Sequence, residues 1–587
     1  MCGIFGYISS EKYDVNYVGQ EVSESIKHRG PDSNHIYYDQ NYNALIGHRR
    51  LSIIDLSSKS DQPYVHKNVV MSFNGEIYNY KELRSELKKE GVFFKTGSDT
   101  EVLINVYTQW GIKGFQKLNG MFAVSFYDKN INKMILLRDR IGEKPILYYS
   151  TSDAFAFSSE AKSFKYFPVV RKKIKVSLDN LRKSIHMMWL DDNESTSIDG
   201  IIRVPPASYL ILDLDNYSIK IEKYWSLEIE PVRLSYSQAV SRYKELLLES
   251  VKIRCRSDCG VSVMLSGGLD SSLISSMMKS INVKFDTYTL EFDSNNSEHE
   301  KAKYMADYLG VKNKAIHIDY KDAFYSLKEN INLYDDLTTF DPGLITSYIA
   351  SKAISKYGEK VVILGEGSDE INGGYGKFKA SLYPYKILPS FLKNSIVYYA
   401  SSRNNYSFNS FIASTNSLSS KLNNISGSYL QKLTGYDIQY QLPNHLLMKV
   451  DRATMAYSLE ARVPFLDHNL VEFVHNLPDD FKLLRTKNHV THKRILQDVA
   501  REYLPKQILS RKKFGMMLPI GEFISENKVF IGNLIVRNKE LIHELIPNIN
   551  INRMLKDISN HGRSTGSEWL IWRFIIVIFW VNYSEIV

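Results

Sequence analysis

The chain has 587 residues, of which 44% are hydrophobic and 24% charged, which is typical of a globular protein and excludes a mainly disordered one. Lys and Arg outnumber Asp and Glu by 74 − 65 = 9, and the interspersed charges predict a mildly basic surface with no nucleic-acid partner. The three cysteines are too few for a disulfide scaffold or a four-cysteine zinc site. Two of them, Cys255 and Cys259, are four residues apart, which predicts reduced thiols on one helix face.

The first 160 residues are expected to form short strands and two helices. Apolar β-type runs at 3–8, 69–73, 121–128 and 134–139 are separated by turn signals. Residues 80–90 place Leu83 and Leu87 four apart and stop at Gly91, which predicts a capped helix. An alternating stretch at 209–225 then predicts a hairpin that turns near Asp215 and Asn216.

After about residue 235 the pattern changes to strands that alternate with helices. Apolar strands are expected at 261–265, 286–292, 314–318 and 361–364, and the segments between them have helical periodicity. This βαβ alternation predicts a parallel sheet with helices on its faces. The Ser-, Asn- and Tyr-rich stretch at about 380–430 is expected to be a helical or loop insertion.

The two ends of the chain predict a cytoplasmic protein. Residues 1–14 lack the positive start and the long apolar run of a signal peptide. The strongest apolar segment, residues 569–581, is shorter than the roughly 20 residues that a membrane span needs, and Arg573 interrupts it. We therefore expect a buried C-terminal helix and no membrane span.

A glycine- and serine-rich loop, SGGLDSS (266–272), lies between a predicted strand and a predicted helix. Two glycines let the backbone approach an anion closely, and a helix N-terminus offers free N–H groups and a partial positive charge. The Walker pattern with its Lys-Ser/Thr ending is absent, which excludes a standard kinase or GTPase loop. The loop predicts a phosphate site, with an ordinary strand-to-helix turn as the alternative.

A second polar loop, GEGSDE (365–370), follows the strand at 361–364 and precedes Gly373, Gly374 and Tyr375. Ligands of open α/β sheets bind beyond the carboxyl ends of the strands, where both loops are expected. Asp270 and Asp369 could therefore share Mg²⁺ on a nucleotide.

These loops carry a family resemblance. SGGLDSS resembles the signature of the PP-loop ATP pyrophosphatases, and GEGSDE with LLMKVDRATMAYSLEARVPFLDH (446–468) resembles the synthetase domain of glutamine-hydrolysing asparagine synthetases. The resemblance implies that Asp270 and Asp369 bind Mg²⁺, that Glu366 assists acyl-adenylate formation and that Lys449 lies near the phosphates. The ATP site implied in this way consists of Leu265, Ser266, Gly267, Gly268, Asp270, Ser271, Ser272, Leu290, Leu364 and Gly365.

Cys2 stands where removal of Met1 would expose it as the first residue. A thiol of ordinary pKa is only about 3% thiolate at pH 7, whereas an α-amino group with a pKa of about 7.7–8.0 is close enough to neutrality to act as its base. An N-terminal cysteine therefore supplies nucleophile and base together. Taken alone, residue 2 is better explained as a chance cysteine beside the initiator methionine.

Four polar clusters between the early strands change that balance: HRGPDS (28–33), HRRLSIIDL (48–56), NGEIYN (74–79) and GSDTE (97–101). With Cys2 and RDRIGEKP (138–145) they resemble the glutaminase domain of class II amidotransferases, an N-terminal-nucleophile fold. The resemblance implies that Cys2 attacks the glutamine amide and that Asn74 and the Gly75 N–H form the oxyanion hole. The glutamine site implied in this way consists of Arg50, Leu51, Ser52, Ile53, Ile54, Asn74, Gly75, Glu76 and Asp99.

Together the resemblances imply an α/β and α+β chain of two domains. Residues 1–229 are expected to form an N-terminal-nucleophile αββα sandwich, and residues 230–587 a PP-loop doubly wound parallel sheet with a helical C-terminal part. The implied reaction consumes L-glutamine, ATP with Mg²⁺ and a carboxylate acceptor, for which aspartate is favoured, and ammonia is expected to travel through a dry internal passage. Family analogy is consistent with a homodimer.

Three alternatives remain open at this point. The acceptor could be another carboxylate, such as a uronic acid of a surface glycan, because Leu364 and Asn372 depart from the family pattern and residues 334–342 match it only loosely. A β-lactam-forming relative would have no use for the intact Cys2 site. A catalytically dead scaffold would be expected to have lost Cys2, Asp270, Asp369 or Lys449, and all four are present.

Overall fold

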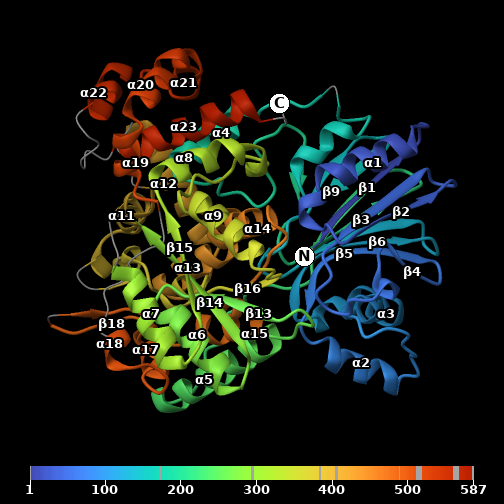
Figure 1. Ribbon diagram of the computed structural model, residues 1–587, viewed down its shortest axis with the longest axis horizontal. Coiled ribbons are helices and arrows are strands. Elements are labelled where there is room, and N and C mark those ends of the chain that lie inside the picture. The colour runs from blue at the N-terminus through green and yellow to red at the C-terminus, as the bar shows by residue number, and fades with distance from the viewer. Residues whose placement is uncertain are drawn as a thin grey trace.

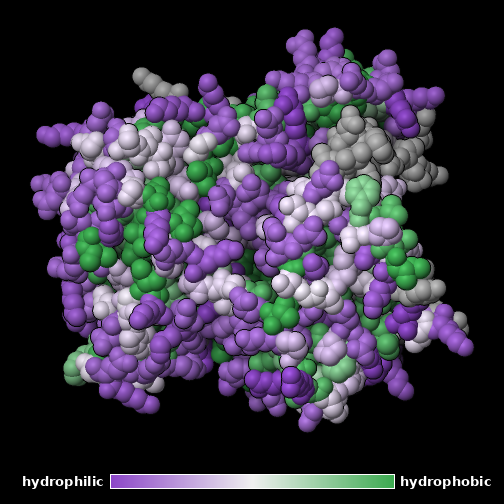
Figure 2. Space-filling model, turned by 180° about the vertical axis from the view of Figure 1, so that it is seen from behind, coloured by the Kyte–Doolittle hydropathy of each residue, from purple (hydrophilic) through white to green (hydrophobic). Residues whose placement is uncertain are grey.

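The computed structural model describes residues 2–171, 173–292, 297–382, 385–402, 408–487, 489–509, 518–559 and 567–584. Figure 1 shows two regions side by side, a blue-to-teal one built on antiparallel strands and a green-to-red one dominated by helices around a smaller sheet. Figure 2 shows a largely hydrophilic face on which hydrophobic groups form small separate patches, as the interspersed charges predict.

Two stacked six-stranded sheets form the N-terminal part. The first sheet has the order β10 (Ile202–Arg203), β8 (Leu147–Ser150), β9 (Ala154–Ser158), β1 (Gly3–Ser9), β3 (Ala44–Arg50) and β2 (Ser33–Asp39). The second has the order β12 (Ile219–Lys223), β11 (Ser208–Asp213), β7 (Lys133–Arg138), β6 (Gly120–Asp128), β5 (Val69–Ile77) and β4 (Tyr64–His66). All strand pairs in both sheets are antiparallel.

Alternating apolar side chains fill the space between these sheets. Ile4 and Ile8 of β1 meet Val70 of β5, Leu136 of β7 and Leu210 of β11 in one buried cluster. Helix α1 (Val15–Ser25) covers the outer face of the first sheet, and α2 (Tyr80–Lys89) and α3 (Asp99–Trp110) pack beyond the second. The layers therefore run helix, sheet, sheet, helix, which confirms the predicted αββα sandwich.

Local predictions in this part are mostly confirmed. The hairpin β11–β12 turns after Leu212 pairs with Ile219, and α2 ends next to Gly91, whose φ is +87°. The prediction of two helices is wrong, because α1 is a third one. The inward face of α1 consists chiefly of Val18 and Val22, and its other residues are mostly polar. This apolar pattern is too weak to predict a helix from the sequence.

A five-stranded sheet lies at the centre of the C-terminal part. Its order is β15 (Asn313–Ile318), β14 (Phe285–Phe292), β13 (Val261–Met264), β16 (Val361–Ile363) and β17 (Glu460–Arg462), and every pair is parallel. The chain moves outward from β13 to β15 and then returns to the other side of β13. The carboxyl ends of β13 and β16 therefore meet where the strand order reverses, which is where such sheets bind ligands.

Helices cover both faces of the parallel sheet, as predicted. Val261 and Val263 of β13 face α5 (Tyr236–Arg254), α6 (Leu269–Ser280) and α7 (Ser297–Leu309), whereas Met264 faces α9 (Gly343–Lys356) and α14 (Leu447–Met455). Strand β17 was not predicted. It follows α14 directly, and α14 continues a π-helical segment, Asp437–Leu446, that begins where α13 (Tyr429–Tyr436) ends.

The insertion at about 380–430 is helical where it is described, although residues 383–384 and 403–407 lie outside the described residues. The remaining described elements of the C-terminal part are mostly short helices: α8 (Tyr320–Glu329), α10 (Ser368–Asn372), α11 (Ser390–Ser402), α12 (Phe408–Asn423), α15 (His468–His475), α16 (Asp479–Lys482), α17 (Arg494–Ala500), α18 (Lys506–Leu509), α19 (Ile520–Glu526), α20 (Lys528–Arg537), α21 (Lys539–Leu545) and α22 (Ile551–Ser559), with the hairpin β18 (Leu484–Arg485) and β19 (Val490–Thr491). Helix α4 (Leu178–Met187) belongs to the N-terminal part of the sequence and packs under α23 (Glu568–Tyr583).

Helix α23 (Glu568–Tyr583) is the apolar segment near the C-terminus, and it is buried as predicted. It is apolar on every side because protein surrounds it, and its charged Arg573 donates to the Ile185 carbonyl at 2.6 Å. The Trp580 indole donates to the Asp335 carbonyl at 2.8 Å. Within the described ranges, every helix is too short or too polar to cross a membrane.

Candidate functional site

Cys2 lies directly before β1, facing β5 across the sandwich. Its backbone N–H donates to Asn74 Oδ1 at 3.0 Å, and its Sγ lies 4.0 Å from the Leu51 carbonyl oxygen. Cys2 is 7% exposed, and burial raises the pKa of its thiol. A neutral thiol of this kind needs a base to become a nucleophile, and the backbone nitrogen of Cys2 would be a free amine once Met1 is removed.

Asn74 offers an unused hydrogen-bond donor beside this thiol. Its carboxamide oxygen accepts from Cys2, but its Nδ2 is buried without a hydrogen-bond partner among the described residues. A buried donor left free in this way is uncommon in folded proteins and indicates a functional role. Gly75 follows at φ +145°, where a Cβ would lie 2.0 Å from the Met121 carbonyl oxygen of the neighbouring strand, so only glycine fits.

Two buried carboxylates lie near the thiol. Asp99 accepts from the Ile77 N–H at 3.0 Å, and burial raises its pKa to about 6. Burial and the proximity of Asp99 also raise the pKa of Glu76, whose Oε1 lies 3.3 Å from Arg462. Two neighbouring carboxylates with raised pKa values are suited to binding a cation such as a ligand ammonium group.

The loop at 50–61 closes this site. Arg50 is buried, and its guanidinium donates to Asp61 at 2.7 Å and to the carbonyls of Ser57 and Asp55. It is therefore fixed by its own loop. The other predicted members of this loop are Leu51, Ile53 and Ile54, which are buried, and Ser52, which is half-buried.

The prediction of a shared helix face for Cys255 and Cys259 is wrong. Helix α5 ends at Arg254, so Cys255 is its C-cap residue and Cys259 lies in the loop before β13. The thiol of Cys259 instead contacts the 50–61 loop, 3.3 Å from the Ser52 carbonyl oxygen. Both cysteines are free thiols.

The second candidate site lies at the carboxyl ends of β13 and β16. Gly267 has φ +63°, and a Cβ there would lie 2.7 Å from the Ala302 nitrogen of α7. A Cβ on Gly365 would lie 3.2 Å from Cβ of Asp270, so the two predicted loops pack directly on one another. Helix α6 begins after Gly268 with no side-chain cap, which leaves its first N–H groups available to an anion.

Serine hydroxyls fix the shape of the loop after β13. The Ser266 N–H donates to Ser271 Oγ at 3.2 Å, and the Gly268 N–H donates to Ser266 Oγ at the same distance. Ser272 Oγ is buried and has no partner among the described residues. Leu265 is fully buried in the core, and its N–H continues the sheet to the Tyr288 carbonyl.

A cavity of about 290 Å³ opens beside these loops. Its predicted lining residues are Ser266, Asp270, Ser271, Leu290, Leu364, Gly365, Glu366, Asp369 and Lys449. Four other predicted residues lie behind the wall and support the loop there: Leu265, Gly267, Gly268 and Ser272. The cavity is thus apolar on the side of Leu290 and Leu364 and charged on the side of Asp270, Glu366 and Lys449.

Lys449 lies between two carboxylates of the cavity wall. Its Nζ is 3.3 Å from Asp341 and 3.5 Å from Glu366. Although burial acts in the opposite direction, these carboxylates raise the pKa of Lys449, which therefore stays charged. Asp341 belongs to the loosely matched segment at 334–342, and sequence reasoning gave it no role.

Asp270 and Asp369 converge on one ammonium group, that of Lys493. Its Nζ lies 2.8 Å from a carboxylate oxygen of each aspartate and 3.2 Å from Ser368 Oγ. The oxygens of the two aspartates therefore lie close enough to share one cation. Mg²⁺ favours oxygen ligands and usually takes one or two carboxylates plus substrate phosphates, so these residues fit it. In the part of the chain that the structure describes, no three His, Cys, Asp or Glu residues lie together in a group that could hold a metal ion. No spacing in the sequence pointed to Lys493.

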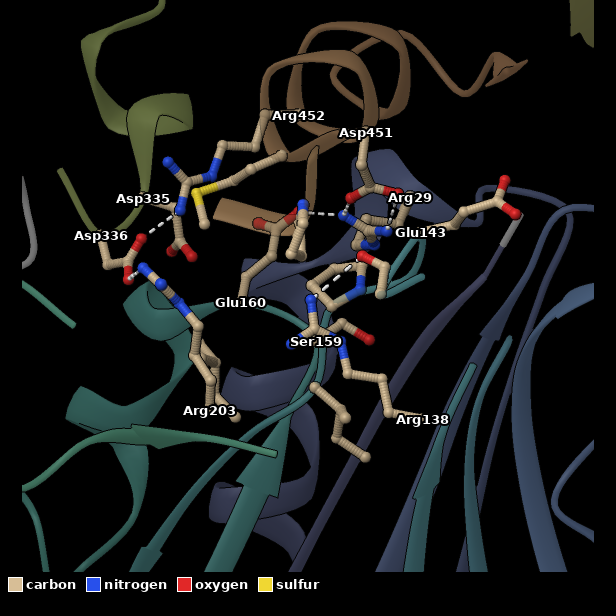
Figure 3. Close-up of a pocket in the computed structure, with 16 residues that line it drawn as sticks. Arg29, Arg138, Glu143, Ser159, Glu160, Arg203, Asp335, Asp336, Asp451 and Arg452 are labelled. Atoms are coloured by element: carbon tan, nitrogen blue, oxygen red, sulfur yellow. Dashed lines mark hydrogen bonds and ion pairs between the residues drawn. The ribbon is translucent and has the colours of Figure 1, made fainter. Parts of the chain in front are cut away.

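A smaller cavity of about 30 Å³ lies between the two parts of the chain (Figure 3). Arg29 forms one of its walls, and its Nε donates to the Cys2 carbonyl at 3.1 Å. The guanidinium also donates to Asp451 of α14 at 2.9 and 3.1 Å and to Glu160 at 2.8 Å. Arg29 thus links the residue that carries the thiol to the helix that carries Lys449.

The opposite wall of this cavity is built around Asp335 and Asp336. Arg203 donates to Asp336 at 2.7 Å, and Arg452 of α14 pairs with the same carboxylate. Asp335 accepts from the backbone N–H groups of Ala161 and Lys162 at 2.7 and 2.8 Å. Residues far apart in sequence therefore close the cavity together.

Comparison with known proteins agrees with this arrangement. Residues 242–580 match the family model described as asparagine synthase, and residues 1–225 match the model described as glutamine amidotransferase domain. The chain is 30% identical to glutamine-hydrolyzing asparagine synthetase 1 of Bacillus subtilis, over 99% of this chain and 96% of the relative. It is 32% identical to putative glutamine-hydrolyzing asparagine synthetase 2 of Methanocaldococcus jannaschii, over 64% and 76%. It is 28% identical to amidase chry2 of Gibberella zeae, over 88% and 89%.

One family model covers more than half of the chain, and the Bacillus relative matches nearly all of it. The chain therefore belongs to the asparagine synthase family, and it is an ATP-dependent, glutamine-hydrolysing ligase.

Proposed function

We propose that this protein is a glutamine-dependent asparagine synthetase. Residues 1–229 hydrolyse L-glutamine at Cys2, and residues 230–587 activate aspartate with MgATP as its β-aspartyl adenylate. Ammonia from the first site attacks the adenylate, giving asparagine, AMP, pyrophosphate and glutamate. The observation that carries the proposal is that one arginine, Arg29, contacts both Cys2 and α14, so the two sites share a wall.

The first site supports amide hydrolysis. The thiolate of Cys2 attacks the glutamine amide after its proton passes to the free α-amino group, which returns the proton as ammonia leaves from the tetrahedral intermediate. Water then hydrolyses the remaining Cys2 thioester and releases glutamate. The unused Nδ2 of Asn74 and the Gly75 N–H supply donors where negative charge develops, each worth roughly 2.7–4 kcal/mol. Glu76 and Asp99 receive the ammonium group of glutamine, and Arg50 with its loop receives the carboxylate.

The second site supports adenylate formation. The uncapped start of α6 and the serines of the loop after β13 receive the phosphates, and the apolar wall at Leu290 and Leu364 receives adenosine. Mg²⁺ held by Asp270 and Asp369 would neutralise charge on the leaving pyrophosphate. Glu366 and Lys449 lie together where the acceptor carboxylate meets the nucleotide.

The cavity between the sites supports the passage of ammonia. Its volume of about 30 Å³ exceeds the roughly 10–15 Å³ that a molecule the size of water needs. Apolar side chains such as Ile146, Leu147 and Met448 line it together with charged ones, and among the latter Arg29 pairs with Asp451 and Arg203 with Asp336. Burial lowers the pKa of Arg29, yet Asp451 and Glu160 outweigh it and raise that pKa, so this guanidinium does not protonate passing ammonia.

Asp341 supports aspartate as the acceptor. Aspartate carries an ammonium group beside its reacting end, and buried Asp341 in the cavity wall provides a matching anion. A uronic acid, the alternative acceptor, offers hydroxyls at that position instead. Of the two departures from the family pattern, Asn372 donates to Tyr243 and Ser368 and is absent from the cavity wall, while Leu364 contributes to the apolar side.

The test is incubation with glutamine, MgATP and one acceptor at a time, with pyrophosphate and product amide both measured. We expect pyrophosphate and asparagine in equal amounts with aspartate. Pyrophosphate release with a uronic acid and not with aspartate would favour the alternative.

Cys2→Ala should abolish the glutamine-dependent reaction and retain the one supported by ammonium salt. Loss of both would contradict the two-site scheme.

A further inference from the structure

Lys493 is held in the candidate nucleotide site by contacts on three sides. Its ammonium lies within 3.0 Å of both oxygens of Asp270, 2.8 Å from Asp369 and 3.2 Å from Ser368 Oγ. The side chain is only 8% exposed. The lysine is therefore the cation that two carboxylates of the cavity wall share.

The backbone around Lys493 is shaped for this contact. Lys493 has φ +51° and ψ +39°, a left-handed conformation that is unfavourable for a non-glycine residue. A Cβ on Gly374 would lie 1.9 Å from Asp369 Oδ1 and 2.4 Å from Cε of Lys493. The glycine of the GGY motif thus leaves space for the aspartate–lysine pair, and strain of this kind persists where the surroundings enforce it.

Lys493 and a magnesium ion cannot use these oxygens at the same time. Mg²⁺ binds carboxylate oxygens at about 2.0–2.1 Å and requires nearly octahedral geometry. A fixed ammonium 2.8 Å from the same oxygens would lie beside the metal as a like charge in a buried site. One cation must leave when the other arrives.

We propose that Lys493 competes with Mg²⁺ for Asp270 and Asp369, so that the metal enters with the nucleotide and the displaced ammonium pairs with the phosphates. The proposal rests on the nucleotide site described above. It follows from charge balance, because each state leaves the two aspartates and the lysine paired, and an unpaired buried charge is strongly unfavourable. Lys493 is then a positioning residue that sets the order of binding.

The experiment measures metal affinity in the absence of nucleotide. Mg²⁺, and Mn²⁺ as a spectroscopic substitute, are titrated into the protein by calorimetry and electron paramagnetic resonance. Wild type should bind either metal only in the millimolar range. Lys493→Gln, which removes the competing charge, should bind at least about tenfold more tightly. Lys493→Arg, which keeps the charge, should remain weak.

Lys449→Gln is the matched control, because this second buried lysine of the cavity pairs with Asp341 and Glu366 instead. It should leave metal affinity unchanged. The same titrations with α,β-methylene-ATP present should show that the gain in metal affinity caused by the nucleotide is smaller in Lys493→Gln than in wild type. Glutamine hydrolysis by each variant reports whether the fold is intact.

Micromolar metal binding by the wild type without nucleotide would overturn the proposal, whatever the variants do. Equal metal affinity of wild type and a folded Lys493→Gln would do the same. Neither readout depends on the acceptor or on turnover. A protein that amidates some other carboxylate would still show the exchange, so failure of the proposed function and failure of this inference can be told apart.

Discussion

The two ends of the Asn74 carboxamide are in different situations. The oxygen accepts a hydrogen bond from Cys2, which fixes the rotamer, while the nitrogen is buried with no partner among the described residues. Burying an unsatisfied donor costs about 1–3 kcal/mol, and a transition-state oxyanion would recover this cost. The donor is therefore already oriented before the substrate arrives.

Asn74→Ala tests whether this donor stabilises the oxyanion. Removing one oxyanion donor is expected to lower kcat for glutamine hydrolysis about 10²- to 10³-fold. The ammonium-supported reaction should be unchanged, because Asn74 lies at the other site. Steady-state assays of glutamate and pyrophosphate check both. An equal loss of the two activities would point to a structural role for Asn74.

Asp270→Asn tests the opposite site. The substitution keeps the size of the side chain and removes one of the two carboxylates that face Lys493. We expect pyrophosphate release to fall by at least about 100-fold, because a proposed metal ligand is lost, while glutamine hydrolysis continues. Glutaminase activity that fell in parallel would indicate misfolding or tighter coupling of the sites than the geometry suggests.

Among the elements, α14 connects the two cavities. Lys449 faces the larger cavity, while Asp451 and Arg452 face the smaller one and bind Arg29 and Asp336. One turn of helix thus presents charges to both sites, and a shift of α14 on one side must alter contacts on the other. The motif KVDRA was recognised from the sequence, but its division between two cavities depends on packing that no local pattern encodes.

Asp451→Asn should be destabilising because it removes the charge of the carboxylate that accepts two hydrogen bonds from the buried Arg29 and leaves Glu160 as the remaining charged partner. Breaking a buried pair in this way costs roughly 3–5 kcal/mol, to be measured by urea unfolding. Glu86→Gln, which breaks an exposed pair with Lys117, is the control and should change stability by less than about 1 kcal/mol. Similar values for the two variants would argue against Arg29 as a structural link.

Strand β17 shows why part of the parallel sheet was not predictable. Parallel strands buried on both faces normally read as apolar runs, but β17 is Glu-Ala-Arg, and its charges are buried as an ion pair at 2.6 Å. The charges of Glu460 and Arg462 offset each other, and Arg462 also pairs with Glu76 of the other part of the chain. By contrast, β13 with its glycine loop was predictable, because a strand, a turn and a helix start are all local signals. Lys493 and Asp341 were missed because only the tertiary fold brings them to the cavity.

At the scale of the whole molecule, burial keeps several histidines uncharged. Burial lowers the pKa to about 3 for His48 and His475 and to about 4 for His445. Their unfolded pKa is about 6.5. A group whose pKa is lower in the folded state contributes stability that is fully present above its unfolded pKa. That stability is lost as the pH falls through the unfolded pKa toward the folded one.

His475→Gln isolates one such contribution. The stability of wild type relative to the variant should be constant above about pH 7 and should decline by about 1.4 kcal/mol per pH unit between pH 6 and 4. Urea unfolding at several pH values measures this difference, and the values near pH 8 serve as the internal control. A difference that did not change with pH would mean that His475 is charged in the folded protein or accessible to water.

The contact between Trp580 and Asp335 has a consequence for how the protein is made. Asp335 forms part of the wall of the smaller cavity, and its carbonyl is held by an indole 245 residues further along the chain. A ribosome must therefore have passed residue 580 before that wall can close. The strands of the two six-stranded sheets emerge long before this point, so we expect a growing chain to fold its N-terminal part early and to close the wall between its two parts only after Trp580 has emerged.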